Sequence, residues 1–140
     1  MDRAEWQQIA EEKLHAADAL LAAGEWASAY YLAGYAVECG LKSCVLVRLA
    51  TTPHLIFEDK RYSLDCWTHK IGSLLKLAGL KNDLDTDITS NPAIGVHWMY
   101  VKDWNEESRY RGWTENEAKT LYNAIVHATD GVMTWIRKRW

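Results

Sequence analysis

The stretch from Tyr30 to Lys42, YYLAGYAVECGLK, decides the fold. It is as apolar as a buried helix, yet it holds one acid and one base, Glu38 and Lys42, four residues apart. Residues at this spacing are neighbours on one face of an α-helix, so the two side chains can form an ion pair. Small residues of the same helix let a second helix backbone approach closely; they are Ala29, Ala33, Ala36 and Gly40. The pattern predicts a helical bundle with a polar site on one flank.

The composition is that of a globular protein. The 140-residue chain is 49% hydrophobic and 25% charged, and its formal net charge is −3. A chain of this length is expected to form one domain, residues 1–140, which can bury a core without disulfides or a metal. The mildly acidic balance argues against binding nucleic acid through a wholly basic surface, but it is compatible with a local basic patch.

Cysteine usage and the chain start indicate a cytoplasmic protein. Cys39, Cys44 and Cys66 are odd in number and form no CxxC pair, which predicts reduced thiols rather than a disulfide framework. The N-terminal residues are charged, and no apolar run is long enough for a membrane span. No grouping has metal-ligand spacing and no glycine-rich phosphate loop occurs, so we expect neither a metal nor a cofactor.

Helical periodicity predicts five helices and no strands. Capping boxes mark two of the helix starts, Asp2 with Glu5 and Thr114 with Glu117. The short connection at Gly24 implies that the first two helices are antiparallel neighbours. Within residues 50–67, where the periodicity is weak, the polar stretch 57–62 is expected to form a loop, and residues 82–91 are acidic and turn-rich. The predicted helices cover about 2–23, 25–49, 69–78 and 92–105, and the last runs from 114 onward with a bend at Gly131. The expected fold is an all-α antiparallel bundle of four to five helices.

The segment Trp104–Tyr110, WNEESRY, is the second informative stretch. Arg109 within it is expected to reach back to Glu38, because a half-buried carboxylate needs a cation or hydrogen-bond donors. One interpretation is a structural clamp that locks this loop to the bundle. The other is a phosphate- or ribose-binding arginine with aromatic stacking surfaces, including Trp113, beside it. The binding candidates under the second interpretation are Arg109, Tyr110, Trp104 and Arg111.

Four segments together resemble the HEPN family (higher eukaryotes and prokaryotes nucleotide-binding). They are YLAGYAVECGLK at 31–42, THKI at 68–71, the Trp104–Tyr110 segment, and GVMTWI at 131–136. The resemblance covers almost the whole chain and implies a HEPN-like bundle that is usually dimeric. It also implies a prokaryotic protein of a toxin–antitoxin, defence or RNA-processing system, in a family where many members are metal-independent ribonucleases.

Those ribonucleases carry an Arg followed, after four to six residues, by a His, and the two residues meet at the dimer cleft. Arg109 has no His within the next six residues. Arg48 and His54 have the spacing, but such a match is expected by chance in this chain and it straddles Pro53. The prediction is therefore an RNA- or nucleotide-associated interaction module without catalysis. The alternative is a diverged ribonuclease with a composite site at a dimer cleft, for which the candidates are Arg109, Glu38, Lys42 and His69.

The resemblance bears on partners as well. A third hypothesis is a nucleotide-binding partner of a separately encoded nucleotidyltransferase. Related proteins carry an acid after the histidine equivalent to His69, but Lys70 stands there, so a His–Asp pair is not carried over. Eight Trp in so small a chain favour a homodimer with aromatic residues at its seam, with a monomeric bundle as the alternative. The tryptophans expected there are Trp98, Trp104, Trp113, Trp135 and Trp140.

Overall fold

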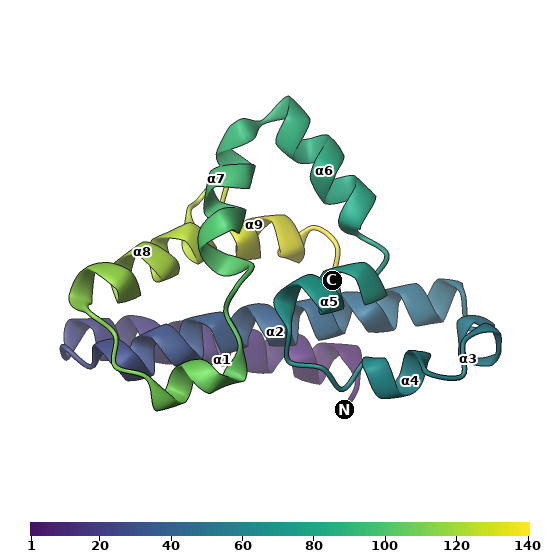
Figure 1. The fold of residues 1–140 in the computed structure, drawn as a ribbon, viewed down its shortest axis with the longest axis horizontal. Helices are drawn as coiled ribbons and strands as arrows, with labels where there is room; N and C mark the ends of the chain where they lie inside the picture. Colours follow the sequence, from purple (N-terminus) through teal and green to yellow (C-terminus); the bar gives the residue numbers. More distant parts are fainter.

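The first two helices set the architecture. In the computed structural model, which describes residues 1–140, α1 (Arg3–Ala22) and α2 (Trp26–Thr51) lie side by side and run antiparallel (Figure 1). Asp2 and Glu5 form the predicted capping box at the start of α1. Gly24 reverses the chain between the helices with a φ of 76°, a left-handed conformation that glycine adopts without strain. The prediction for this hairpin is confirmed.

The rest of the chain adds shorter helices around α2. They are α3 (Leu55–Glu58), α4 (Tyr62–Asp65), α5 (Ile71–Leu77), α6 (Lys81–Ser90), α7 (Pro92–Val101), the 3-10 helix η1 (Glu106–Tyr110), α8 (Glu115–Val126) and α9 (Val132–Arg137). The structure contains no strand, so the all-α prediction is confirmed. Besides α1, α2 contacts α5, η1, α8 and α9, whereas α6 and α7 form an arch that rises from this layer (Figure 1). No helix is both long and apolar enough to span a membrane.

Several segments differ from the sequence-based prediction. Residues 50–67 contain α3 and α4, and residues 82–91 lie in α6 and its C-terminal cap instead of forming turns. In α6, buried Leu84 and the contact of Ile88 with Gly95 of α7 show that packing overrides the turn-like composition. The fourth predicted helix ends at Val101, short of residue 105.

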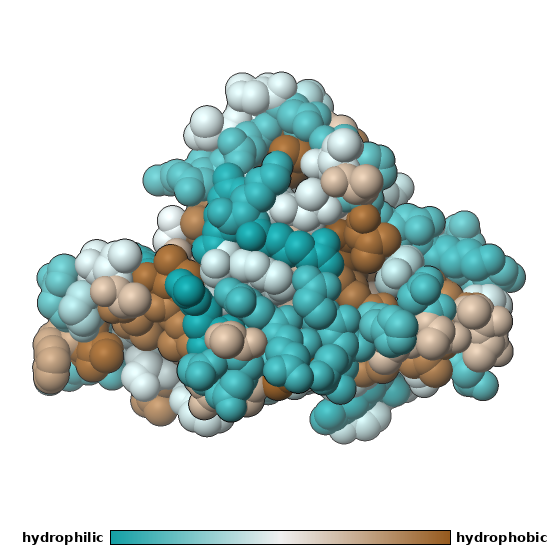
Figure 2. All heavy atoms as spheres, turned by 180° about the vertical axis from the view of Figure 1, so that it is seen from behind, coloured by the Kyte–Doolittle hydropathy of each residue, from teal (hydrophilic) through white to brown (hydrophobic).

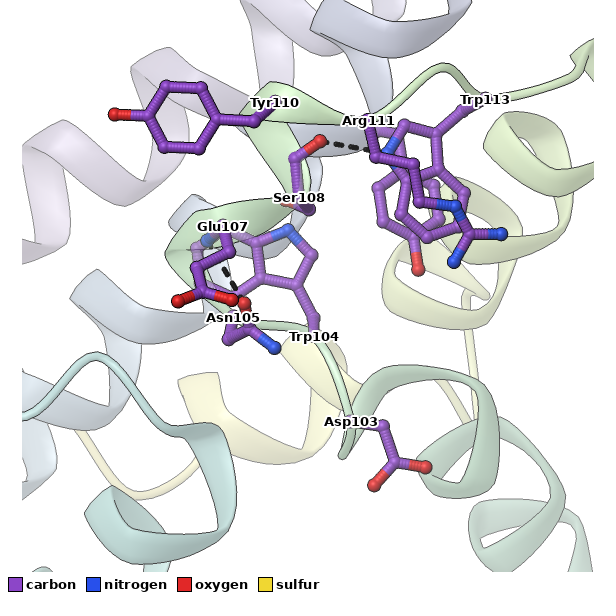
Figure 3. Close-up of a pocket in the computed structure, with 9 residues that line it drawn as sticks. Asp103, Trp104, Asn105, Glu107, Ser108, Tyr110, Arg111 and Trp113 are labelled. Carbon is purple, nitrogen blue, oxygen red and sulfur yellow. Dashed lines mark hydrogen bonds between the residues drawn. The ribbon is translucent and has the colours of Figure 1, made fainter.

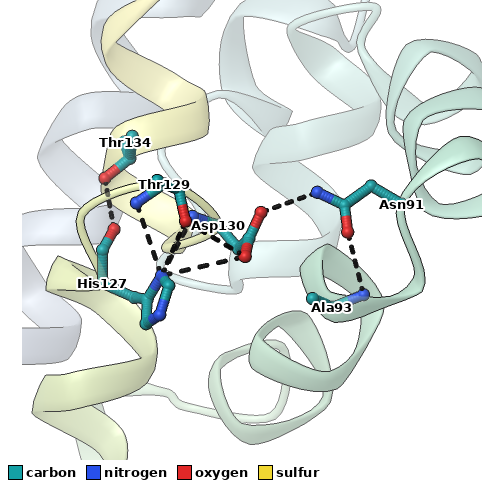
Figure 4. Close-up of polar contacts among 6 residues, drawn as sticks. All are labelled: Asn91, Ala93, His127, Thr129, Asp130 and Thr134. Carbon is teal, nitrogen blue, oxygen red and sulfur yellow. Dashed lines mark hydrogen bonds and ion pairs between the residues drawn. The ribbon is translucent and has the colours of Figure 1, made fainter.

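The predicted last helix is two helices. α8 begins at the expected capping box of Thr114, but it ends at Val126, and the chain turns before α9. Hydrogen bonds hold this turn (Figure 4). The backbone N–H of Asp130 donates to Nδ1 of His127 at 3.1 Å, and the amide of Asn91 donates to Oδ1 of Asp130 at 2.6 Å. These bonds fix the turn both locally and to the start of α7. Gly131 therefore lies between two separate helices, whereas a bend within one helix was predicted.

The core fills the space between α1, α2, α5, α8 and α9. Trp104 closes one side of it, because its side chain is only 3% exposed and its indole packs directly on Gly34 of α2. All three cysteines are free thiols, and burial raises the pKa of Cys39 to about 12. Largest among the fully buried side chains are Leu41, Ile71, Leu74, Leu75, Leu84, Leu121, Ile125, Met133 and Ile136.

Candidate functional site

Glu38 on α2 is the centre of a buried polar cluster. Its side chain is 1% exposed, and its Oε1 accepts a hydrogen bond from Nζ of Lys42 at 2.8 Å, as the spacing of four predicts. The same oxygen lies 2.9 Å from Nδ1 of His69. His69 stands just before α5, and the packing of α5 on α2 brings the imidazole to the carboxylate. Glu38 therefore supplies the acid partner that Lys70 does not provide.

This geometry orients the imidazole. An ionised carboxylate accepts hydrogen bonds and cannot donate them, so the bond to Glu38 assigns the proton to Nδ1 of His69. In the neutral ring Nε2 is then the nitrogen that can accept a hydrogen bond. The imidazole is 48% exposed, which leaves it accessible from solvent. A carboxylate-oriented imidazole is the arrangement of a general base. Oε2 of Glu38 is buried without a hydrogen-bond partner, so the cluster keeps one free acceptor.

Arg109 does not belong to this cluster. The prediction that it pairs with Glu38 is wrong, because Lys42 and His69 already occupy Oε1 and Arg109 forms no ion pair. Arg109 is exposed on η1, and its guanidinium carbon lies 4.7 Å from the ring centroid of Tyr110. Tyr110 itself is 78% exposed. The clamp interpretation therefore fails, and an exposed arginine–tyrosine pair takes its place.

Arg109→Ala is accordingly expected to melt at the same temperature as the parent protein. The substitution removes no buried contact, so thermal unfolding followed by far-UV circular dichroism should be unchanged. Arg139→Ala is the matched control, because Arg139 donates to Asp87 at 2.7 Å and lies 3.8 Å from the ring of Trp135. The control should melt at a clearly lower temperature. A large loss for Arg109→Ala would restore the clamp interpretation.

A pocket of about 470 Å³ opens beneath η1, lined by Tyr30 and by residues between 103 and 113 (Figure 3). The expectation that Trp104 and Trp113 offer stacking surfaces there is wrong. Trp104 is buried, and the ring of Trp113 stacks on Tyr30 with 3.6 Å between centroids. The guanidinium of Arg111 lies 4.0 Å from the same indole, so both of its faces are covered. Tyr110 extends away from Trp113 in Figure 3 and is the exposed ring of this segment.

Two residues that line this pocket each carry a buried polar group without a hydrogen-bond partner. The two groups are Nε1 of Trp104 and Oγ of Ser108. In Figure 3 the indole of Trp104 lies next to Ser108. Each group can donate a hydrogen bond, and leaving a buried donor unpaired is unfavourable. Nε1 of Trp104 packs against Gly34 of α2, so the Ser108 hydroxyl is the one of the two that is a candidate to donate to an acceptor atom in the pocket.

The pocket continues along α5 through two further cavities. One of about 360 Å³ shares Asp103, Trp104 and Asn105 with it. The next, of about 580 Å³, shares Lys70, Ser73 and Lys76 with the second and reaches Trp67, which is 77% exposed. We call the linings of these three cavities the α5–η1 surface. It holds the lysines Lys70, Lys76 and Lys102.

Two of the three lysines of the α5–η1 surface are free of ion pairs, although three carboxylates line the same cavities. Lys70 and Lys76 form no ion pair, and Lys102 lies 3.9 Å from exposed Asp103. The composition was compatible with a local basic patch but gave no position for one, because these lysines come from different elements. Their proximity follows from the placement of the loop after α7 against α5.

Arg48 and His54 do not form a site. Arg48 donates to the backbone carbonyl of Leu77 at 2.9 Å, which secures the C-terminal end of α5. His54 is exposed and lies 3.5 Å from Glu58. This agrees with the interpretation of their spacing as a chance match. No group of three or more histidines, cysteines and carboxylates is placed to hold a metal ion.

Residues 4–56 match the family model of the HEPN domain. The N-terminal part of the chain is therefore similar to the HEPN domain. The matched region covers the α1–α2 hairpin, including Glu38 and Lys42, and it ends before His69 and the α5–η1 surface. No curated protein and no solved structure matches the chain significantly. The match supports the HEPN resemblance for the segment at 31–42, and the segments at 68–71, 104–110 and 131–136 lie outside it.

Proposed function

We propose that this HEPN-like protein is an RNA- or nucleotide-associated interaction module of a prokaryotic toxin–antitoxin or defence system, without catalysis of its own. The observation that carries the proposal is the α5–η1 surface, in which lysines lie between two exposed aromatic rings, Trp67 and Tyr110. Lysines bind backbone phosphates, and exposed rings stack on unpaired bases.

The form of this surface favours a single strand over a duplex. Stacking on Trp67 and Tyr110 requires bases that are not already paired, and sequence-tolerant recognition of RNA uses such rings. The carboxylates of Asp65, Asp103 and Glu107 border the same cavities and weaken the attraction for phosphate. We therefore expect moderate affinity that falls steeply with salt.

Replacing Lys70 and Lys76 together by glutamine is expected to weaken binding of a fluorescein-labelled single-stranded RNA by about tenfold or more at low salt. Each lost phosphate contact should lower the slope of log affinity against log salt by about 0.7. Fluorescence anisotropy at several salt concentrations measures both effects. The matched control replaces Lys81 and Lys119, exposed lysines outside the α5–η1 surface that each pair with a carboxylate four residues away. If both double variants lost the same RNA affinity, the loss would come from the change in net charge, and binding at the α5–η1 surface would be contradicted.

The proposal includes a cytoplasmic homodimer, which the tryptophan content also favours, and a nucleotidyltransferase-type partner protein, which the HEPN resemblance alone supports. The seam must differ from the one expected, because Trp104 and Trp135 are buried within the chain. Trp98, Trp113 and Trp140 keep partial exposure. Light scattering at micromolar concentration tests the dimer, and a mass near 16 kDa would reject it. Co-purification with the product of a neighbouring nucleotidyltransferase gene tests the partner.

A second candidate function, metal-independent ribonuclease, is favoured by one observation. His69 is oriented by Glu38 as a general base would be, and Lys42 lies on the same carboxylate. RNA cleavage in the presence of a chelator, abolished in His69→Gln, would support this alternative. Intact RNA with the parent protein, under conditions where the α5–η1 surface binds it, would support the non-catalytic module.

A further inference from the structure

A second kind of pocket lies at the other end of α2 from η1. It has a volume of about 380 Å³, and its walls are almost entirely apolar. The walls come from the start of α1, the C-terminal half of α2 and the α3–α4 segment, and they include Trp6, Val45, Leu46, Leu49, Tyr62 and Trp67. Apolar side chains also show on the surface at the end of the molecule that holds α3 (Figure 2).

The charged side chain in the lining of this pocket is a lysine. Lys42 is the only charged side chain in its lining, and no acid lines it. Nζ of Lys42 lies 4.9 Å from the ring centroid of Trp6, and the Lys42 side chain is 14% exposed. One N–H of the ammonium is used by Glu38, so its other donors remain for a ligand.

We propose that this pocket binds a small carboxylic acid with an apolar, aromatic or aliphatic body. The body occupies the space between Leu46, Leu49 and Trp67, and the carboxylate accepts a hydrogen bond from Lys42. The volume lies in the usual range of small-molecule sites, which combine apolar walls with a few fixed polar groups. Lys42 is paired with Glu38, but Glu38 is 1% exposed and does not line the pocket, so an entering anion meets the ammonium and is favoured over a cation or a neutral molecule of the same shape.

The choice of a small acid over a protein partner rests on where the charge lies. Lys42 is almost buried, so a carboxylate must enter the pocket to reach it. A carboxylate on a free small molecule can do this, whereas an acidic side chain on a docked helix would meet the more exposed rim residues Ile56 and Trp67 first. An acidic amphipathic peptide is therefore the competing occupant that the experiment must separate.

A cysteine in the pocket lining, Cys66, allows ligand binding to be followed by its rate of alkylation. Cys66 is part of the lining and half-buried, whereas Cys39 and Cys44 are buried, so Cys66 is the cysteine that iodoacetamide reaches first. Burial raises the pKa of the Cys66 thiol, so the reaction is run at mildly alkaline pH. A ligand in the pocket should slow alkylation of Cys66, which mass spectrometry measures on the intact chain.

The test uses 1-naphthaleneacetate and its neutral isostere 1-naphthaleneacetamide with the full chain. We expect the acid to bind about tenfold more tightly than the amide in calorimetry, as a charge-assisted hydrogen bond gives, and to protect Cys66 at lower concentration. The double variant Lys42→Met with Glu38→Gln avoids leaving Glu38 unpaired and should bind the two compounds equally.

Three results would overturn the proposal. Equal affinity of the parent protein for the acid and the amide would show that Lys42 does not bind the ligand's carboxylate. Absence of binding by both compounds, with unchanged alkylation of Cys66, would exclude a small-molecule pocket. Protection of Cys66 by an acidic amphipathic peptide, where naphthaleneacetate gives none, would assign the surface to a protein partner.

Discussion

Replacing Lys42 by methionine is expected to lower the free energy of unfolding by about 3 kcal/mol. Methionine keeps the apolar stem of lysine but removes the ammonium, so the buried carboxylate of Glu38 loses its nearest cation. Breaking a buried pair is more harmful than replacing both members, because one charge is left uncompensated. His69 remains at 2.9 Å as a partial substitute, which places the expected loss at the lower end of the range for buried pairs. Urea unfolding followed by circular dichroism measures it.

Lys119→Met is the matched control for this prediction. Lys119 pairs with Glu115 four residues earlier on α8, with Nζ and Oε1 2.6 Å apart, but both side chains are about half exposed. An exposed pair of this kind contributes about 0.5 kcal/mol or less. The double variant Lys42→Met with Glu38→Gln should recover part of the loss, because it removes the unpaired charge. If Lys42→Met lowered the free energy of unfolding as little as Lys119→Met does, Lys42 would not be needed to stabilise the buried charge of Glu38.

The two partners of Glu38, Lys42 and His69, differ in whether the sequence could predict them. Glu38 and Lys42 are four residues apart on one helix, and helix geometry alone brings them together. His69 lies 31 residues from Glu38, so its contact depends on how α5 packs on α2. Arg109 was assigned to Glu38 because a cation was needed, and no local rule indicated that His69 would meet that need. Contacts between distant segments are what pattern reasoning cannot supply.

The same division holds for the fold. The capping box of Asp2 and the left-handed glycine at Gly24 are local signals, and the α1–α2 hairpin they predict is present. The break between α8 and α9 depends on hydrogen bonds that join His127, Asp130 and Asn91 across 39 residues of chain. The aromatic residues of the Trp104–Tyr110 segment were ambiguous for a similar reason. A sequence pattern does not distinguish a tryptophan that fills the core from one that stacks on a ligand.

For Trp104 the sequence did contain one indirect signal. Gly34 lies in the middle of α2, where glycine costs about 1 kcal/mol relative to alanine and usually has a packing reason. The reason is the indole of Trp104, which occupies the space that a Cβ would need. A glycine in a long helix and a tryptophan 70 residues later thus form one contact.

Gly34→Ala is therefore expected to destabilise the protein by about 3 kcal/mol, although alanine is the better helix former. The added methyl collides with the pyrrole ring of Trp104, which is rigid, 3% exposed and packed into the core, so it cannot move aside cheaply. Gly72→Ala on α5 is the matched control, because nothing lies within 4 Å of its added Cβ. That substitution should stabilise the protein by about 0.5–1 kcal/mol.

Opposite signs for the same chemical change, measured by urea unfolding, would establish that Trp104 is seated on α2. Replacing Trp104 by leucine in the Gly34→Ala background should relieve the collision, so the two substitutions together should cost less than the sum of their separate effects. Because Trp104 also lines the pocket beneath η1, Gly34→Ala should alter that pocket as well. If Gly34→Ala instead stabilised the protein as Gly72→Ala does, the indole would have to lie elsewhere. The α5–η1 surface would then lose one of the three side chains shared by its two cavities nearest η1.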